Sequence, residues 1–257
     1  MFKKQPIILS FSLFLLWTLS TYLLEGRLLT FLRPDAVVDR LIYILVANFI
    51  IGIGLSIVIL RHLALKNLIS VQKAGFQSIK HTSITVVIGL VLGISIYFLQ
   101  NPPTMHPVVI LNAFFQVLSV TIAEILVCWV VIGSAFESGF ENLGKYHSVI
   151  IAIILSSILF GLYHYAHSPP FNTIEMVSFL SFIGLFTGLF FFISRNVYAT
   201  IVFHNFFGIK GVLQALDKAD QLSSYEVFHP PLLITAIIAL ISLIVMHYFV
   251  LRSLDDK

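Results

Sequence analysis

Long apolar runs constrain this chain more than any other feature of its sequence. They lie near residues 7–24, 41–60, 82–99, 108–135, 148–167, 174–193, 197–216 and 231–251. A helix of about 20 apolar residues is long enough to cross the ~30 Å hydrocarbon core of a bilayer. The strands of a membrane barrel would be shorter and would alternate in polarity. The sequence therefore predicts an all-α, multi-pass membrane protein with about eight transmembrane helices.

The composition supports this class. Hydrophobic residues make up 58% of the 257 residues and charged residues only 11%, whereas about 25% of a soluble domain is charged. No internal repeat or low-complexity linker divides the chain, so residues 1–257 are expected to form a single integral membrane domain. The basic residues lie between apolar runs, so no nucleic-acid partner is expected. The single Cys128 excludes an internal disulfide.

The charges flanking the runs predict the orientation. The first run ends at Glu25-Gly26-Arg27 rather than at a small-residue cleavage site, which indicates a retained helix and not a removed signal. One side collects Lys3, Lys4, Arg61, Lys66, Lys73, Lys80, Lys145, Arg195, Arg252 and Lys257, and the other has Arg27, Arg33, Arg40, Lys210 and Lys218. Cytoplasmic loops carry the excess of Lys and Arg, so both termini are expected in the cytoplasm, with the protein in the cell membrane.

The longest connection on the predicted cytoplasmic side runs from Arg61 to His81. It carries Leu65, Leu68, Phe76 and Ile79 among its bases. The pattern fits an amphipathic helix lying on anionic headgroups. It fits equally well a solvated loop that only sets the topology.

A few polar residues lie inside the apolar runs of the second half. They are Glu124, the pair His164 and His167, and the pair His204 and Asn205. The first two histidines, three residues apart, share one helix face, and the following Pro169-Pro170 ends that helix. Because such side chains are costly in hydrocarbon, we expect them to face the protein interior. Each could also be a packing residue without chemistry, above all His167, which is predicted at the water boundary.

One acid and two histidines on separate helices suggest two kinds of chemistry. Glu124 and one histidine could activate a water molecule while the other histidine stabilises an oxyanion, which would hydrolyse a peptide bond. Alternatively, Glu124 and the three histidines His164, His167 and His204 could bind a divalent metal ion. The metal alternative is less favoured because the chain has no His-Glu-x-x-His motif. No cofactor is therefore expected.

These residues resemble the CAAX protease and bacteriocin-processing family of intramembrane endopeptidases. The resemblance covers roughly residues 108–216, the family-like core. Its second motif, Phe-x-x-x-His, is Phe160-Gly161-Leu162-Tyr163-His164, and its third is the apolar run Val197–Phe203 that ends in His204. The resemblance implies that His164 partners the catalytic base and that His204 is an oxyanion donor. Phe160, Asn205 and His167 are expected to support the site or bind substrate.

The first motif departs from the family pattern Glu-Glu-x-x-x-Arg. Its best register places Ala123 and Glu124 on the two glutamates and Cys128 on the arginine. The family's third histidine is followed four residues later by Asn, but here Gly208 stands there and Asn205 directly follows His204. Glu124 is therefore a candidate base that must turn into the cavity, which needs a helix rotation or a locally widened turn. Restoring the motif with Ala123→Glu and Cys128→Arg is expected to raise turnover.

Depth along the helices argues against a shared site if the helices are upright. Counted from the cytoplasmic ends of their runs, His164 lies about 24 Å deep and His204 about 10 Å. The two meet only if the turn at Ser194-Arg195-Asn196 lies deeper than drawn or the helices tilt strongly.

The predicted function is that of an intramembrane endopeptidase that cleaves a membrane-associated peptide with glutamate- and histidine-activated water. The expected partners are the lipid bilayer and a peptide or lipid-anchored protein substrate, and the oligomeric state is open. The alternative is a catalytically inactive relative that acts as a membrane scaffold or a bacteriocin self-immunity protein. A solute transporter is disfavoured because no paired inverted repeats or broken helices are visible.

Overall fold

The computed structural model describes residues 4–29 and 36–251, and its regular structure is helical throughout. Four bases that entered the orientation count, Lys3, Arg33, Arg252 and Lys257, lie outside the described residues. The helices are α1 (Lys4–Thr21), η1 (Tyr22–Gly26), α2 (Val37–Tyr43), η2 (Ile44–Leu55), α3 (Ser56–Leu65), α4 (Ile79–Leu99), α5 (Pro107–Glu124), η3 (Ile125–Gly133), α6 (Ser134–Gly139), η4 (Glu141–Leu143), α7 (Lys145–Tyr163), η5 (His164–Ala166), α8 (Ile174–Ser194), α9 (Val197–Lys218), η6 (Leu222–Tyr225), α10 (Pro230–Met246) and η7 (His247–Leu251).

Adjoining helices merge into long continuous segments, which matches the predicted apolar runs. Among the described residues, 7 such segments are long and apolar enough to cross a membrane. The run at 197–216 forms α9, which is long but does not meet that criterion. It carries His204, Lys210 and Gln214 along its length. The protein is thus a multi-pass membrane protein in which the least apolar long helix bears one of the candidate site residues.

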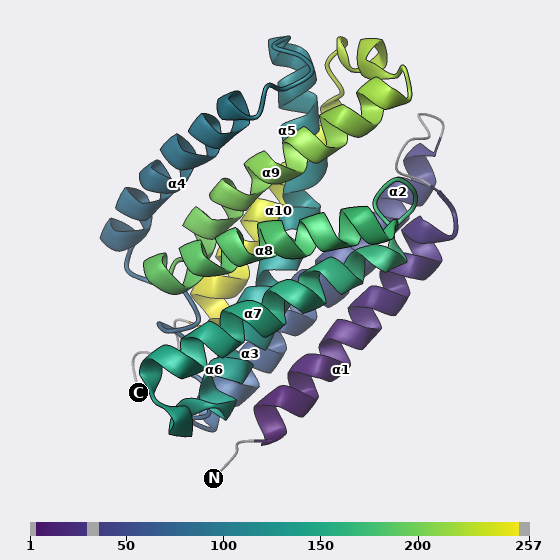
Figure 1. Ribbon diagram of the computed structural model, residues 1–257. Helices are drawn as coiled ribbons and strands as arrows, with labels where there is room; N and C mark the ends of the chain where they lie inside the picture. Colours follow the sequence, from purple (N-terminus) through teal and green to yellow (C-terminus); the bar gives the residue numbers. More distant parts are fainter. Residues whose placement is uncertain (1–3, 30–35, 252–257) are drawn as a thin grey trace.

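The segment α5–η3–α6 forms the centre of the bundle. Within its most apolar stretch 83% of the residues are buried, against 17–44% in the other candidate spans. Residues 122–131 are all buried there, and only Glu124 among them has any exposed surface, 5%. The other helices surround this segment, and α1 begins at the same end of the molecule as α6 (Figure 1). A polar group on the central segment is therefore shielded from lipid.

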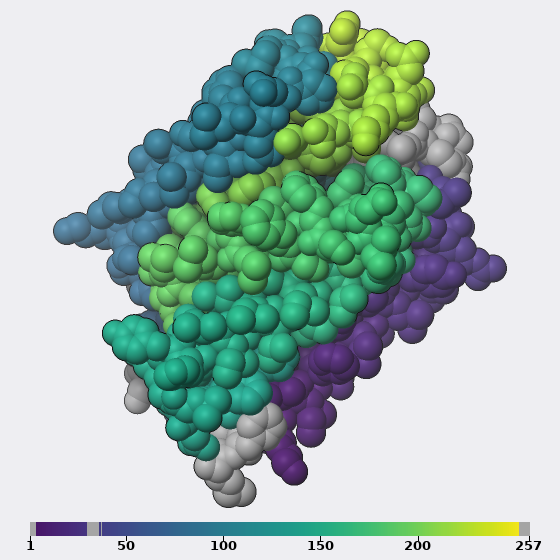
Figure 2. All heavy atoms as spheres, viewed as in Figure 1, coloured from purple at the N-terminus to yellow at the C-terminus, as the bar shows by residue number. Residues whose placement is uncertain are grey.

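Three antiparallel helices lie beside the central segment on one face. α7 and α8 form a hairpin, and α9 turns back from the end of α8 toward the opposite end of the bundle (Figure 1). On the face shown in Figure 2, α8 and α7 lie side by side between α4 and α1. This arrangement brings the end of α7 and the first half of α9 to the two sides of α5.

The connection between α3 and α4 is neither an interfacial helix nor a solvated loop. Residues 66–78 form a series of turns without a helix. Ile69, Val71 and Phe76 are buried in the core, because this segment folds inward. The carbonyl oxygen of Gly75 accepts a hydrogen bond of 2.9 Å from the backbone N–H of Val197. The segment therefore covers the start of α9, which corrects both alternatives drawn from the sequence.

Candidate active site

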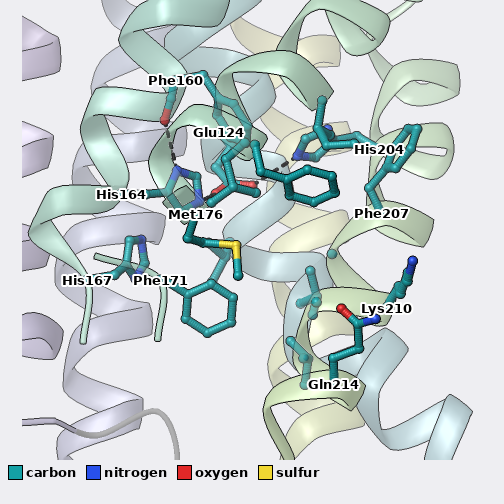
Figure 3. Close-up of a pocket in the computed structure, with 18 of the residues that line it drawn as sticks. Glu124, Phe160, His164, His167, Phe171, Met176, His204, Phe207, Lys210 and Gln214 are labelled. Carbon is teal, nitrogen blue, oxygen red and sulfur yellow. Dashed lines mark hydrogen bonds and ion pairs between the residues drawn. The ribbon is translucent and has the colours of Figure 1, made fainter. Parts of the chain in front are cut away.

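Glu124 is the last residue of α5, and its carboxylate lies between two histidines. Oε1 is 3.6 Å from Nε2 of His164, and Oε2 is 3.4 Å from Nε2 of His204. All three side chains are buried. Figure 3 shows Glu124 between the two imidazole rings, which come from the end of α7 and from α9. Residues that the sequence placed on three separate helices therefore meet at one point.

The helix changes its geometry directly after Glu124. Residues 125–133 form the π-helical segment η3, in which the wider turn shifts the angular phase of residues on either side. Such a widened turn is the device that the sequence required for residue 124, rather than 123, to face the cavity. Ala123 instead points at η2, where a methyl group on Gly52 would overlap its Cβ atom. Position 123 has no room for a longer side chain.

His164 is held in one orientation by the helix turn that precedes it. Its Nδ1 is 2.8 Å from the carbonyl oxygen of Phe160. Because a carbonyl only accepts, Nδ1 carries a proton, and Nε2 is the nitrogen that gains and loses one. The Phe160 ring packs edge-on against the imidazole, with centroids 4.7 Å apart. Phe160 thus supports His164 through its backbone and its ring.

His204 is held from the other side by α8. Its Nδ1 is 2.7 Å from the hydroxyl oxygen of Thr187. The rings of Trp129 and Phe160 lie 5.6 Å and 5.1 Å from the imidazole, centroid to centroid. These contacts fix the ring so that Nε2 points to Glu124.

The start of α9 is buried inside the protein, whereas the sequence suggested a turn at the cytoplasmic end of the bundle. Asn196, which caps that helix, is fully buried, as is Val197. The turn at 194–196 lies beneath the 66–78 segment, and Arg195 there binds both carboxylate oxygens of Glu137 at 2.7 Å. His164 also leans back toward the preceding turn of α7. Both rings contact the carboxylate of Glu124, so the gap that upright helices would leave between them is absent.

The part of the chain that holds Glu124, His164 and His204 is similar to a known protein family. Residues 107–209 match the family model described as type II CAAX prenyl endopeptidase Rce1-like. We call residues 107–209 the Rce1-like region because of this similarity. The matched range holds Glu124, His164 and His204, and nearly coincides with the core expected at 108–216. No curated protein and no solved structure gives a significant match to the chain.

The three departures of the Rce1-like region from the family motifs have structural consequences. Cys128 is fully buried, so an uncharged thiol occupies the motif's arginine position. Gly208 lines the cavity, and a Cβ atom there would overlap the side chain of Val117. Asn205 points away from the site and donates to the carbonyl oxygen of Phe114 at 3.2 Å. Restoring the motif at 123 and 128 would place two charges in packed apolar positions, which removes the basis for expecting higher turnover.

A cavity of about 120 Å³ opens beside the carboxylate of Glu124. Since a water molecule needs about 10–15 Å³ on this measure, several fit. Its walls are mostly apolar and come from α5, the 167–173 connection, α8 and α9: Val117, Val120, Phe171, Met176, Phe179, Leu180, Ile183, Phe207, Gly211 and Val212. Gln100, Gln116, Lys210 and Gln214 add polar groups, and Lys210 and Gln214 lie away from the histidines (Figure 3).

His167 lies inside the protein, although its sequence context predicts a position at the water boundary. It is buried with 8% of its surface exposed, and its Nδ1 is 3.0 Å from Oε2 of Glu25. Glu25 belongs to η1, at the end of the first helix, and is itself 1% exposed. No pattern in the sequence indicates this contact, because an acid at the end of an apolar run is ordinarily a group at the membrane surface.

Within 4–29 and 36–251, no group of three or more His, Cys, Asp or Glu side chains is placed to hold a metal ion. Glu124, His164 and His204 face one another as acid and bases instead. The arrangement is suited to moving protons between a carboxylate, two imidazoles and water.

Proposed function

We propose that this protein is an intramembrane endopeptidase in which Glu124 activates water. The observation that carries the proposal is the position of its carboxylate, 3.4–3.6 Å from two imidazole nitrogens. These separations exceed those of direct hydrogen bonds, which are about 2.7–3.2 Å. A water molecule from the adjoining cavity can therefore reach the carboxylate and be polarised by it.

Hydrolysis then proceeds by transfers among these groups. Glu124 takes one proton from the water molecule as the water oxygen attacks the scissile carbonyl carbon. The π electrons of the carbonyl bond move to the carbonyl oxygen. Nε2 of His164, which faces Oε1, shares that proton and keeps the carboxylate available as a base. The hydroxyl of Thr187 donates to the carbonyl oxygen of Ile183 at 3.2 Å and lies 2.7 Å from Nδ1 of His204. When it turns to donate to Nδ1 instead, Nε2 of His204 carries the N–H that stabilises the oxyanion.

The cavity favours a substrate that carries an apolar group next to its peptide bond. Its walls present aromatic and aliphatic side chains, and Glu124, His164 and His204 line one part of it. The family model that matches the region is named for prenyl endopeptidases that act on CAAX sequences. We therefore assign a prenylated peptide, or a protein with such a lipid anchor, as the substrate class.

The proposal is tested in proteoliposomes with two internally quenched peptides. Both end in the same CAAX sequence, and only one is farnesylated. Wild-type protein should cleave the farnesylated peptide faster, and Glu124→Gln should lower its turnover by about 10³-fold. An absence of cleavage by the wild type, or equal cleavage by the Glu124→Gln variant, would overturn the endopeptidase function.

The departures at Ala123, Cys128 and Gly208 favour one second candidate. A non-catalytic relative would use the same cavity to hold a partner, as a membrane scaffold or a self-immunity protein. In that case, removing the whole protein would abolish its biological effect, whereas Glu124→Gln would leave the effect intact.

We further propose that both termini face the cytoplasm. The described bases Lys4, Arg61, Lys66, Lys73, Lys80, Lys145 and Arg195 support this orientation through the excess of positive charge in cytoplasmic loops. In a Cys128→Ala background, an impermeant thiol reagent applied from outside should label a cysteine at Thr104 and not one at Ser70. Labelling only at Ser70 would reverse the orientation.

A further inference from the structure

A second acid–histidine pair lies beside the same cavity, which its histidine lines, and it is not needed for water activation. It consists of Glu25 from η1 and His167 from the connection after α7. The imidazoles of His167 and His164 lie nearly parallel, 5.2 Å apart between centroids and inclined by 26°. Figure 3 shows His167 near His164, and both residues line the cavity.

Glu25 is surrounded by hydrogen-bond donors. Oε2 accepts from the backbone N–H of Ser168 at 2.9 Å and lies 3.0 Å from Nδ1 of His167. Oε1 accepts from the hydroxyl of Ser168. A buried carboxylate stays ionised when several donors satisfy it. Gly26 permits the close approach, because a methyl group there would overlap the carbonyl oxygen of Ala166.

This arrangement fixes the chemistry of His167. Since a carboxylate accepts at Nδ1, the N–H of His167 points to Glu25. The other ring nitrogen, Nε2, is buried and lacks a hydrogen-bond partner among the described residues. An unpaired buried group costs about 1–3 kcal/mol, and the side chain of His167 lines the cavity. A water or a substrate group is expected to meet Nε2.

We propose that His167, oriented by Glu25, protonates the amine that leaves the substrate, and this step rests on the endopeptidase function proposed above. As the tetrahedral intermediate collapses, the C–N bond breaks and its electron pair stays on nitrogen. That nitrogen takes the proton from Nε2 of an imidazolium His167. The proton that Glu124 removed from water afterwards restores His167 through the cavity water, so one water is consumed and no net proton is lost.

The different roles of Glu124 and Glu25 follow from the groups that each carboxylate contacts. Glu124 lines the cavity and faces its two imidazoles at 3.4–3.6 Å, so it can gain a proton, whereas Glu25 is occupied by three donors and stays an anion. An anion at Nδ1 stabilises the imidazolium that an acid needs. His167 therefore contacts the substrate, and Glu25 is a positioning residue that acts through it.

Comparing an amide with an ester tests this role. The farnesylated CAAX peptide is paired with a depsipeptide in which oxygen replaces the scissile N–H. An alcohol leaves more readily than an amine and depends less on a proton donor. His167→Ala should lower kcat for the amide by about 10²-fold and for the ester by less than about fivefold. The exposed His147→Ala at the start of α7 is the matched control and should change neither rate.

Glu25→Gln provides a second variant that keeps an oxygen acceptor but removes the charge. It should lower the amide rate selectively, with little change in KM. The ratio of amide to ester rates is independent of how much protein folds, because both are measured on one preparation. Equal losses on both peptides, or no loss on either, would overturn the proposal. Failure of the wild type to cleave either peptide would instead overturn the proposed function.

Discussion

The two buried carboxylates of this protein are held in opposite ways. Glu124, in the Rce1-like region, faces two imidazole nitrogens at 3.4–3.6 Å and borders a cavity. Glu25, outside that region, is bound closely by Ser168 and by His167 at 3.0 Å. The first carboxylate has room to exchange a proton with water, and the second does not. Proximity to a histidine is thus a poor guide to the role of an acid, whereas the number of donors it already satisfies is a good one.

The two carboxylates also belong to different parts of the chain. The family match begins at residue 107, yet Glu25 in η1 reaches the turn after α7. The rings of Trp17 and Tyr163 stack 3.7 Å apart, and the hydroxyls of Thr21 and Tyr163 lie 3.2 Å apart. The first helix is therefore part of the wall behind the histidines.

The largest expected effect tests whether a carboxylate can be moved by one residue. Ala123 and Cys128 are both 0% exposed, and Ala123 packs against Gly52. The double change Ala123→Glu with Cys128→Arg would bury two charges without hydrogen-bond partners such as those of Glu25. Burying them lowers the free energy of unfolding by at least about 3–5 kcal/mol. We expect loss of the monodisperse protein in detergent, measured by size-exclusion chromatography. A folded double variant with higher turnover would show that position 123 can serve as the base.

The next effect concerns the two histidines that flank Glu124. His164→Ala and His204→Ala should each reduce turnover of the farnesylated peptide by about 10² or more, because each removes a group that acts on the reacting atoms. His62→Ala, on the exposed surface of α3, is the control and should change little. Full activity in both site variants would disprove the shared site.

A smaller effect is expected at the support of His204. Thr187→Val keeps the size of the side chain and removes the hydroxyl that lies 2.7 Å from Nδ1. One hydrogen bond contributes about 1 kcal/mol, so kcat should fall by about three- to tenfold with KM unchanged. Ser178→Ala, an exposed change on the same helix, controls for damage to α8. A change in KM alone would place Thr187 in substrate binding instead.

Much of the fold and part of the site could be predicted from the sequence. Apolar run length gave the helical segments, and the cost of polar groups in hydrocarbon singled out Glu124, His164 and His204. The burial of the start of α9 could not be predicted, because it depends on the inward fold of residues 66–78 over that helix.

Other parts depend on contacts that have no local pattern. The direction of Asn205 follows from the helix period, and the structure agrees that it does not face the cavity. Glu25 could not be predicted, because its burial depends on a residue 143 positions away. The π-helical turn after Glu124 was anticipated only as a requirement of the chemistry, since no residue in 125–133 signals it.

The central claim is that Glu124 performs the chemistry and Glu25 positions a partner. It is tested most directly by the turnover of the ester peptide with Glu124→Gln and Glu25→Gln, two isosteric changes that each remove one buried charge. We predict a fall of about 10³-fold for Glu124→Gln and of less than about fivefold for Glu25→Gln, because only the first removes the base that activates water. Retention of more than about a tenth of the activity by Glu124→Gln, or an equal fall in both variants, would contradict this account.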